Sequence, residues 1–236
     1  MTELSVAVLI PALNEEEALP ATLAAIPRGR VNRIVVVDNG SRDRTREVAR
    51  EGGAVVVEES RRGYGAACLA GMQHMGAWTD PPDIIVFVDG DAGGSAEHLD
   101  LLLDPIISGV ADLVLGTRRT VEASAHSPVP LHARMGNRLV LTLVHILFGR
   151  RFEDFAPFRA IRTDSLDLLS MDDRDWGWTL QMQVRAVRHA LRIEEVPIPH
   201  SGRRAGRSKI SGTLSGSIRA GSKMLYTAVR ERFRTA

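Results

Sequence analysis

Two aspartates separated by a single glycine follow a short apolar run near the middle of the chain. Asp89 and Asp91 flank Gly90, and the preceding residues 84–88 (Ile-Ile-Val-Phe-Val) are typical of a buried strand. Two carboxylates this close repel each other, and a divalent cation removes that repulsion. Hard cations such as Mg²⁺ take oxygen ligands and keep positions for water and substrate phosphates. The pair therefore indicates a metal that holds a diphosphate, although an aspartate-rich turn also explains these residues.

Two earlier apolar runs also end in polar residues. Residues 5–10 precede the segment Pro11-Ala-Leu-Asn-Glu15, and residues 33–37 precede Asp38-Asn-Gly-Ser-Arg-Asp-Arg-Thr45. Open α/β sheets bind their ligands at the carboxyl ends of the strands. Three strands that each end in this way favour a shared ligand site over an isolated turn.

The elements that must position these residues alternate between strand and helix in the first half of the chain. This alternation predicts an α/β fold with a mostly parallel, doubly wound sheet. We assign no element to residues 150–162, and we expect a mobile loop at 119–130 because it contains serine, histidine and two prolines. Strands are expected at 5–10, 33–37, 54–57, 84–88, 112–116 and 192–197, and helices at about 16–26, 42–51, 64–77, 97–107, 131–148, within 174–191, and at 213–233.

The bulk composition limits the class of protein. A chain of 236 residues is long enough for one well-cored domain. Cys68 is the only cysteine, so no intrachain disulfide forms and a reducing, cytoplasmic compartment is expected. The longest apolar stretch, residues 139–148, is far shorter than the about 20 residues that span a bilayer. We expect no secretory signal, no integral membrane segment and no nucleic-acid partner.

The net charge of +1 hides an asymmetry along the chain. From His200 onward there are nine lysines and arginines and one acid, so this tail carries +8 and the preceding body −7. Such a tail favours phosphate groups or an anionic surface. For its last few arginines, a solvated helix face is the favoured interpretation. The pattern predicts an amphipathic helix that lies on a membrane surface or forms a dimer contact, with one apolar face made of Leu214, Ile218, Gly221, Leu225, Ala228 and Val229.

Four motifs in order resemble those of glycosyltransferase family 2, the inverting nucleotide-sugar enzymes that include cellulose synthase and dolichyl-phosphate mannosyltransferase. They are Pro11-Ala-Leu-Asn-Glu-Glu16, Val36-Val-Asp-Asn-Gly-Ser-Arg-Asp-Arg-Thr45, Gly63-Tyr-Gly-Ala66 and Asp89-Gly-Asp91. The resemblance implies a glycosyltransferase A-type fold with a Rossmann-like sheet. We expect residues 1–212 to form the catalytic domain, with the amphipathic helix at 213–236 as part of it.

Downstream segments point to the polyprenyl-phosphate sugar transferase branch, in a compact form without transmembrane helices. Three residues depart from the family pattern: Asn39 replaces a second Asp, Gln181 a frequent Glu, and Gly93 a frequent metal ligand. The segments that carry this resemblance are Gly116-Thr-Arg118, Asp154-Phe-Ala-Pro-Phe-Arg159, Glu195-Val-Pro197 and Arg203-x-x-Gly-Arg-Ser-Lys-Ile-Ser-Gly212.

The resemblance implies a role for each donor-site residue. Asp38 would accept from the base N–H, and Glu15 from the ribose hydroxyls, although an acid at a helix N-terminus explains Glu15 as well. A dinucleotide fingerprint at Gly63-x-Gly65 is rejected, because the third glycine is missing and the turn is not the first βα turn. Pro11 and Leu13 would line the nucleoside, Gly63 and Gly65 would allow close backbone approach, and Arg203, Arg207 and Lys209 would form a mobile cationic loop over the phosphates.

The reaction implied is metal-dependent. Asp89 and Asp91 would hold Mg²⁺ or Mn²⁺ against the donor diphosphate, with Gly90 between them, and Arg118 would add positive charge near the phosphates. If the acceptor is a hydroxyl, Asp154 is the candidate general base. If the acceptor is a phosphate monoester, no base is needed and Asp154 orients groups near the metal. Structural capping by Asp154 remains open.

The favoured function is sugar transfer from a UDP- or GDP-sugar to a polyprenyl phosphate at the inner membrane face. A soluble hydroxyl acceptor is the first alternative. A sugar-phosphate nucleotidyltransferase is disfavoured, because Pro11-Ala-Leu-Asn-Glu15 stands where a glycine-rich loop is expected. A non-catalytic sugar-nucleotide-binding protein is the last alternative. The sequence leaves open the base and sugar of the donor, the physiological metal and the oligomeric state.

Overall fold

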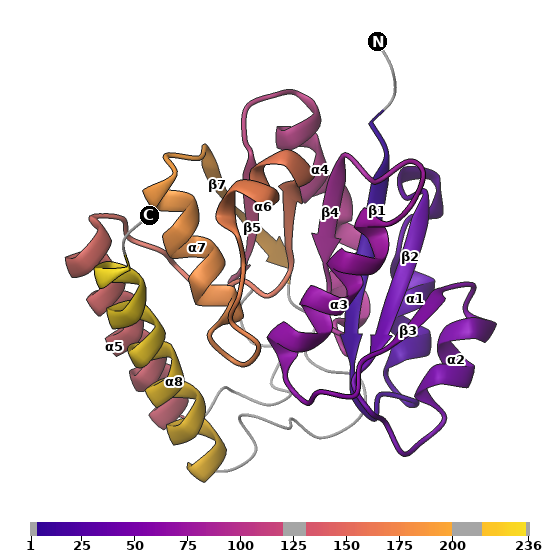
Figure 1. Cartoon of the computed structure of the whole chain (residues 1–236), viewed down its shortest axis with the longest axis horizontal. Coiled ribbons are helices and arrows are strands. Elements are labelled where there is room, and N and C mark those ends of the chain that lie inside the picture. The colour runs from indigo at the N-terminus through magenta and orange to yellow at the C-terminus, as the bar shows by residue number, and fades with distance from the viewer. Residues whose placement is uncertain (1–3, 120–130, 200–213, 235–236) are drawn as a thin grey trace.

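The computed structural model describes residues 4–119, 131–199 and 214–234, and it is built around one seven-stranded sheet (Figure 1). The strands are β1 (Val6–Ala12), β2 (Arg33–Asp38), β3 (Val55–Glu58), β4 (Ile84–Phe87), β5 (Leu113–Arg119), β6 (Arg159–Arg162) and β7 (Ile193–Pro199). The α-helices are α1 (Leu19–Ala25), α2 (Thr45–Glu51), α3 (Tyr64–Gly76), α4 (Leu99–Ile107), α5 (Leu131–Phe148), α6 (Thr163–Leu169), α7 (Trp178–Arg188) and α8 (Leu214–Phe233), and two short 3₁₀ helices are η1 (Arg28–Arg30) and η2 (Gly93–His98).

The strand order is β3-β2-β1-β4-β6-β5-β7, and β6 runs antiparallel to both of its neighbours. The other pairs are parallel, which confirms the expected mostly parallel sheet. Because β6 is antiparallel, it begins where β4 ends, with Arg159 opposite Phe87. The carboxyl ends of the parallel strands and the start of β6 therefore share one edge.

Helices cover both faces of the sheet (Figure 1). In β1, Ala7 and Leu9 pack into the core beneath α3, α5, α6, α7 and α8, whereas Val8 and Ile10 pack beneath α1, α2, η2 and α4. A strand buried on both faces needs apolar residues at successive positions, which is why the runs in β1, β2 and β4 are continuous.

The helix boundaries differ from expectation where side chains reorganise the first turn. α1 begins at Leu19 rather than near 16; residues 16–18 form a turn in which the Glu15 carbonyl accepts from the N–H groups of Ala18 and Leu19, and Pro20 suits the first turn of the helix. α2 begins at Thr45, whose N–H donates to Asp43. The expected helix at 97–107 is η2 followed by α4. The unassigned segment 150–162 contains β6, and α6 was not expected.

The expected loop at 119–130 lies outside the described residues, apart from Arg119 at the end of β5. Among the described residues, no helix combines the length and the apolar character needed to cross a bilayer.

The C-terminal helix α8 lies beside α5 and also packs on α7 (Figure 1). The apolar face expected for this helix is partly wrong. Ala228 is buried as expected, but Thr227 and Glu231 are buried with it, while Val229 keeps 44% of its surface exposed. The face that packs on the protein is therefore partly polar, because it meets charged and polar partners on α7 and in the loop between α6 and α7.

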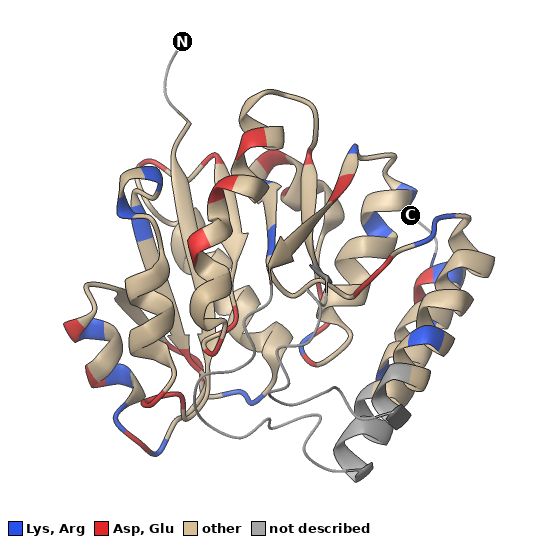
Figure 2. Ribbon diagram, turned by 180° about the vertical axis from the view of Figure 1, so that it is seen from behind, with Lys and Arg blue, Asp and Glu red and all other residues tan. Residues whose placement is uncertain are grey.

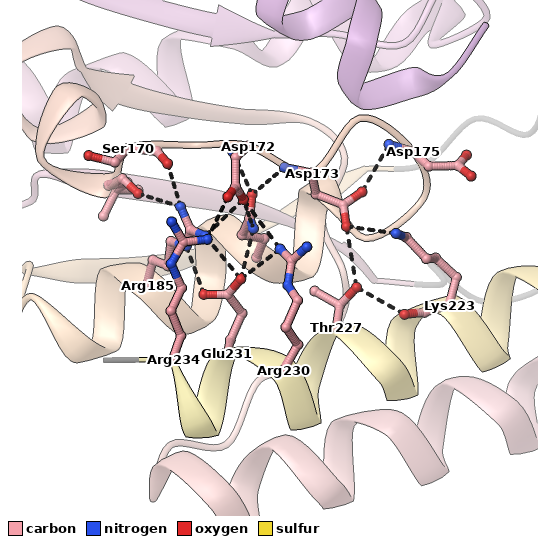
Figure 3. Close-up of polar contacts among 12 residues, drawn as sticks. Ser170, Asp172, Asp173, Asp175, Arg185, Lys223, Thr227, Arg230, Glu231 and Arg234 are labelled. Carbon is pink, nitrogen blue, oxygen red and sulfur yellow. Dashed lines mark hydrogen bonds and ion pairs between the residues drawn. The ribbon is translucent and has the colours of Figure 1, made fainter. Parts of the chain in front are cut away.

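Those partners form a network of ion pairs and hydrogen bonds, with Glu231 and Arg185 buried and Asp172 and Arg234 exposed (Figure 3). The Glu231 carboxylate accepts from Arg185 Nε at 2.8 Å and from Gln181 Nε2 at 2.8 Å. Arg230 and Arg234 reach Asp172 in the same loop. The expectation that the last arginines form a purely solvated face is therefore wrong for these two residues.

Replacing Glu231 with Gln keeps the side-chain shape and removes its charge. Although burial opposes ionisation, hydrogen bonds from Arg185 and Gln181 lower the pKa of Glu231 from 4.5 to about 2. A carboxylate whose pKa is lowered by folding stabilises the fold at pH values above its pKa in the unfolded state. This contribution is lost as the pH falls towards 2. We expect Glu231→Gln to reduce the unfolding free energy by about 3–5 kcal/mol at neutral pH.

Chemical denaturation across the acid range checks this expectation. The difference between wild type and Glu231→Gln should shrink as the pH falls from 4.5 towards 2. Glu194→Gln, at an exposed position on β7, is the matched control and should leave stability nearly unchanged. A deficit in Glu231→Gln that stays constant with pH would contradict a charged role for this side chain.

Candidate active site

The loops that follow β1 and β2 are joined by hydrogen bonds. Asn14 N–H donates to Ser41 Oγ at 2.9 Å, and Glu15 N–H donates to Thr45 Oγ1 at 2.8 Å. Asn14 has a φ of +50°, a left-handed conformation that asparagine tolerates better than most residues. Although burial opposes ionisation, a hydrogen bond from Thr45 and backbone N–H donors lower the pKa of Asp43. The loop that follows β1 is thus fixed against the loop that follows β2, beside the strand ends. We call the loop after β1 the ledge.

Asp38 closes β2 and is 1% exposed. Its carboxylate oxygens accept from Ser41 N–H at 3.1 and 3.3 Å, and Arg46 Nη1 lies 3.6 Å from Oδ2. The side chain therefore shapes the turn that follows β2. Its expected contact with the base of a nucleotide stays a prediction.

Asn39 shows why this chain departs from the second aspartate of the family motif. Its amide nitrogen donates to the carbonyl oxygens of Glu59 at 3.1 Å and Arg61 at 2.7 Å, and its amide oxygen accepts from Gly63 N–H at 2.8 Å. An ionised aspartate has no N–H to offer these two carbonyls. Asn39 thus ties the end of β2 to the turn that starts α3.

Gly63 and Gly65 approach the backbone of the protein itself. A Cβ at Gly63 would lie 2.1 Å from the Arg174 carbonyl oxygen, and a Cβ at Gly65 would lie 2.0 Å from that of Asp173. Ala66 N–H also donates to the Arg174 carbonyl at 3.0 Å. The structure therefore gives these glycines a packing role that the sequence did not indicate, and their approach to a donor stays a prediction.

The turn with the two aspartates is anchored by α1. The buried Thr22 donates from Oγ1 to the Gly90 carbonyl at 2.9 Å and accepts from Gly93 N–H at 3.0 Å. A Cβ on Gly90 would lie 3.2 Å from Glu15 Cγ and 3.5 Å from the Pro11 carbonyl. This turn therefore lies directly against the ledge after β1. The role of Thr22 was not predicted from the sequence. The one indication was that a polar residue stands on the inner face of a short helix.

The carboxylate groups at this turn are suitable ligands for a divalent cation. Asp89 and Asp91 supply carboxylate oxygens, and the described residues contain no cluster of three or more His, Cys, Asp or Glu suited to a metal. Two carboxylates fit Mg²⁺ or Mn²⁺ that takes its remaining ligands from water and phosphate. Burial and the charge of Asp89 raise the pKa of Tyr64 well above its ordinary value, so its hydroxyl stays protonated near this carboxylate.

Asp154 lies in the segment that leads into β6. Its Oδ1 accepts from Phe155 N–H at 2.8 Å, and its carbonyl accepts from the buried Gln183 at 2.9 Å. Nearby, Glu195 accepts from Glu153 N–H at 3.0 Å. Burial, together with the charges of Glu153 and Asp154, raises the pKa of Glu195. Glu195 had no role assigned from the sequence, although it stands in one of the family-like segments.

The remaining expected residues are placed unevenly. Leu13 lies half-buried in the loop after β1, and Gln181 is fully buried in the network with α8. Arg118 lies near the end of β5, at the same sheet edge, and its side chain is not among those that the structure describes. The expected cationic loop lies outside the described residues, with Arg203, Arg207 and Lys209.

The sequence of this chain matches a known protein family. Residues 7–169 match the model of glycosyl transferase family 2. The chain belongs to this family. Membership confirms the expected glycosyltransferase, whose ordered motifs lie at the sheet edge described above.

Two relatives are similar to this chain in sequence, and one solved structure is similar to it in fold. An uncharacterised glycosyltransferase of Mycobacterium tuberculosis is 42% identical over 214 residues, which cover 91% of this chain and 93% of that protein. A dolichyl-phosphate hexose transferase of Haloferax volcanii is 34% identical over 232 residues, which cover 97% and 96%. The second relative confirms the resemblance to the polyprenyl-phosphate branch.

The solved structure is glucosyl-3-phosphoglycerate synthase from Mycobacterium tuberculosis, in complex with Mn²⁺, uridine diphosphate and glucosyl-3-phosphoglycerate. It superposes with a TM-score of 0.75 at 21% identity, over 97% of this chain and 80% of that one. This likeness confirms the glycosyltransferase A-type fold.

A methyl group at residue 65 tests the packing of the α3 turn. Gly65→Ala should lower the unfolding free energy by about 1–3 kcal/mol or more, because the new Cβ meets a carbonyl oxygen. Gly76→Ala, in the same helix with nothing within 4 Å of its Cβ, should raise stability by up to about 1 kcal/mol. Thermal and chemical denaturation of both variants measure this difference. Equal stabilities would contradict the tight contact.

Proposed function

We propose that this family 2 member transfers a hexosyl group from a UDP- or GDP-sugar to a polyprenyl phosphate. The observation that carries the proposal is the position of Gly90, whose turn bears both aspartates and lies against Glu15 and Pro11. A diphosphate held by the aspartates would thus extend its nucleoside over the ledge after β1.

Each part of the donor meets a suitable group on this edge. Pro11 and Leu13 would line the nucleoside, Glu15 would accept from ribose hydroxyls, and Asp38 from the base. The backbone at Gly63 and Gly65 would border the same space. This proposal is supported by the hydrogen bonds that fix Asp38 and the ledge before any ligand arrives, which reduces the ordering needed on binding.

The leaving group of the reaction is a nucleoside diphosphate. A divalent cation held by Asp89 and Asp91 would stabilise the negative charge that develops on it. Arg118 would add positive charge at the same edge, and Arg203, Arg207 and Lys209 would add more from the segment after β7. Charge neutralisation of this kind is what the transfer needs from the protein.

The acceptor decides what Asp154 does. A phosphate monoester already carries the negative charge of a nucleophile, so in-line attack on the sugar needs no general base. We propose that Asp154 orients groups near the metal in that case. The dolichyl-phosphate hexose transferase that is 34% identical over nearly the whole chain supports a lipid phosphate as acceptor.

The surface of the α5 and α8 helix pair supports action at a membrane. Large apolar side chains lie exposed along both helices, among them Ile146 at 72% and Phe233 at 80%. The sequence of α5 contains no acid, and the single acid of α8, Glu231, is buried. Figure 2 shows Lys and Arg positions along α8. An apolar face bordered by cations suits the surface of an anionic bilayer. Met135, Leu139, Tyr226 and Val229 are also exposed on these helices.

The donor reaction is tested by nucleotide release from UDP- and GDP-sugars with Mn²⁺ or Mg²⁺, with and without a short-chain polyprenyl phosphate. We expect release to require both the metal and the lipid phosphate. Asp91→Asn should lower kcat/KM by at least about 10²-fold, because a metal ligand is lost. Asp80→Asn, at an exposed acid before β4, is the control and should keep full activity.

The outcomes of this assay separate the alternatives. Metal-dependent hydrolysis that polyprenyl phosphate does not accelerate would contradict the lipid acceptor and favour a soluble one. Pyrophosphate release from a nucleoside triphosphate would point to a nucleotidyltransferase. No interaction with any sugar nucleotide would overturn the proposal.

The membrane surface is tested by co-sedimentation with vesicles that contain anionic lipid. Wild type should pellet with the vesicles, and less so as salt rises. The double variant Ile146→Glu/Phe233→Glu should stay in the supernatant, because two charges would enter the apolar interface. Val110→Glu, at a residue 57% exposed beyond the end of α4, is the control and should pellet like wild type. Equal pelleting of all three proteins would contradict docking through these helices.

A further inference from the structure

Arg159 is a buried cation at the start of β6. Only 1% of its surface is exposed, and its guanidinium donates to three backbone carbonyl oxygens. Nε reaches Ala156 at 2.8 Å, Nη1 reaches Thr179 at 3.0 Å, and Nη2 reaches Phe155. Carbonyl oxygens satisfy the N–H groups but leave the charge itself without a full counterion, which is costly in a buried position.

The compensating charges are those of the proposed site. Burial lowers the pKa of Arg159 to about 10, and Tyr64, Cys68, Asp89 and Asp154, in that order, oppose this shift. The guanidinium therefore stays charged at neutral pH. A single buried cation thus interacts with an aspartate of the metal turn and with the aspartate expected near the acceptor.

The sheet register explains this placement. Phe87 at the end of β4 lies opposite Arg159, and Asp89 follows two residues later. Arg159 therefore stands at the point where β4 gives way to the metal turn. Tyr64 at the start of α3 also lies near Asp89, whose charge raises the pKa of its hydroxyl.

The turn that carries Asp154 depends on the same guanidinium. Ala156 has a φ of +42°, a left-handed conformation that alanine rarely adopts. Its carbonyl, and that of Phe155, are both held by Arg159. The side chain therefore fixes the strained backbone that directly follows Asp154.

We propose that Arg159 is a positioning residue whose buried charge orients Asp89 at the end of β4 towards the metal, while its hydrogen bonds fix the turn of Asp154. This inference rests on the proposed function, since it assumes that Asp89 binds a cation. Arg159 touches neither donor nor acceptor in this arrangement and acts through the two aspartates. The competing explanation is a core arginine that only stabilises the turn, which predicts reduced stability and unchanged metal affinity.

The experiment measures Mn²⁺ affinity in the presence of UDP, from the electron paramagnetic resonance signal of free Mn²⁺. Arg159→Gln retains N–H donors for the carbonyls and removes the charge, and it should weaken Mn²⁺ binding about 10–100-fold. Arg159→Lys keeps the charge and should recover most of the affinity. Arg162→Gln, at the other end of β6 beside the exposed Asp164, is the control and should bind like wild type. Circular dichroism establishes that each variant is folded.

The outcomes distinguish this inference from the proposed function. A folded Arg159→Gln variant that binds Mn²⁺ as tightly as wild type would overturn the positioning role alone. Failure of the wild type to bind Mn²⁺ with UDP would overturn the proposed function as well. If Arg159→Gln does not fold, Arg159→Met, which keeps the length of the side chain and removes the charge, replaces it in the test. Wild-type Mn²⁺ affinity in a folded Arg159→Met variant, or a folded Arg159→Lys variant that loses affinity as severely as the uncharged variant, would overturn the inference.

Discussion

Parallel pairing of β2, β1 and β4 puts three strand ends side by side, and the polar groups that follow these strands in the candidate site depend on that pairing. The strands are apolar throughout because helices cover both faces, so polar residues gather where the strands end. The loops there would carry many unpaired backbone groups if they were left to themselves. The side chains of Asn14, Asn39 and Thr22 satisfy these groups and fix the loops.

Support for this edge comes from two sides. On one side, α1 fixes the Gly90 turn through Thr22. On the other, the loop between α6 and α7 presses its carbonyls against Gly63 and Gly65. That loop is in turn fastened to α8 through Asp172 and Glu231. Strands and helices far apart in sequence thus converge on a small region.

The sequence predicted what depends on local pattern and missed what depends on distant partners. Continuous apolar runs predicted β1, β2 and β4, and the ordered motifs predicted which ends carry the site. The four-residue strand β6 was missed because it pairs antiparallel with strands distant in the chain. The prediction of the inward face of α8 was partly wrong, because a charged partner of this helix, Asp172, lies elsewhere in the sequence. Arg159 and Thr22 were missed for the same reason, since burial and hydrogen-bond partners are tertiary properties.

The contact between Gly65 and the loop behind it has a consequence for how the protein can be altered at its end. Lys223 and Thr227 contact Asp173, whose carbonyl lies where a Cβ of Gly65 would be. Shortening the chain before Lys223, or fusing a bulky partner there, would release this loop. The far end of the polypeptide therefore supports, through this loop, the turn that starts α3, and its removal would loosen that turn even with every motif intact.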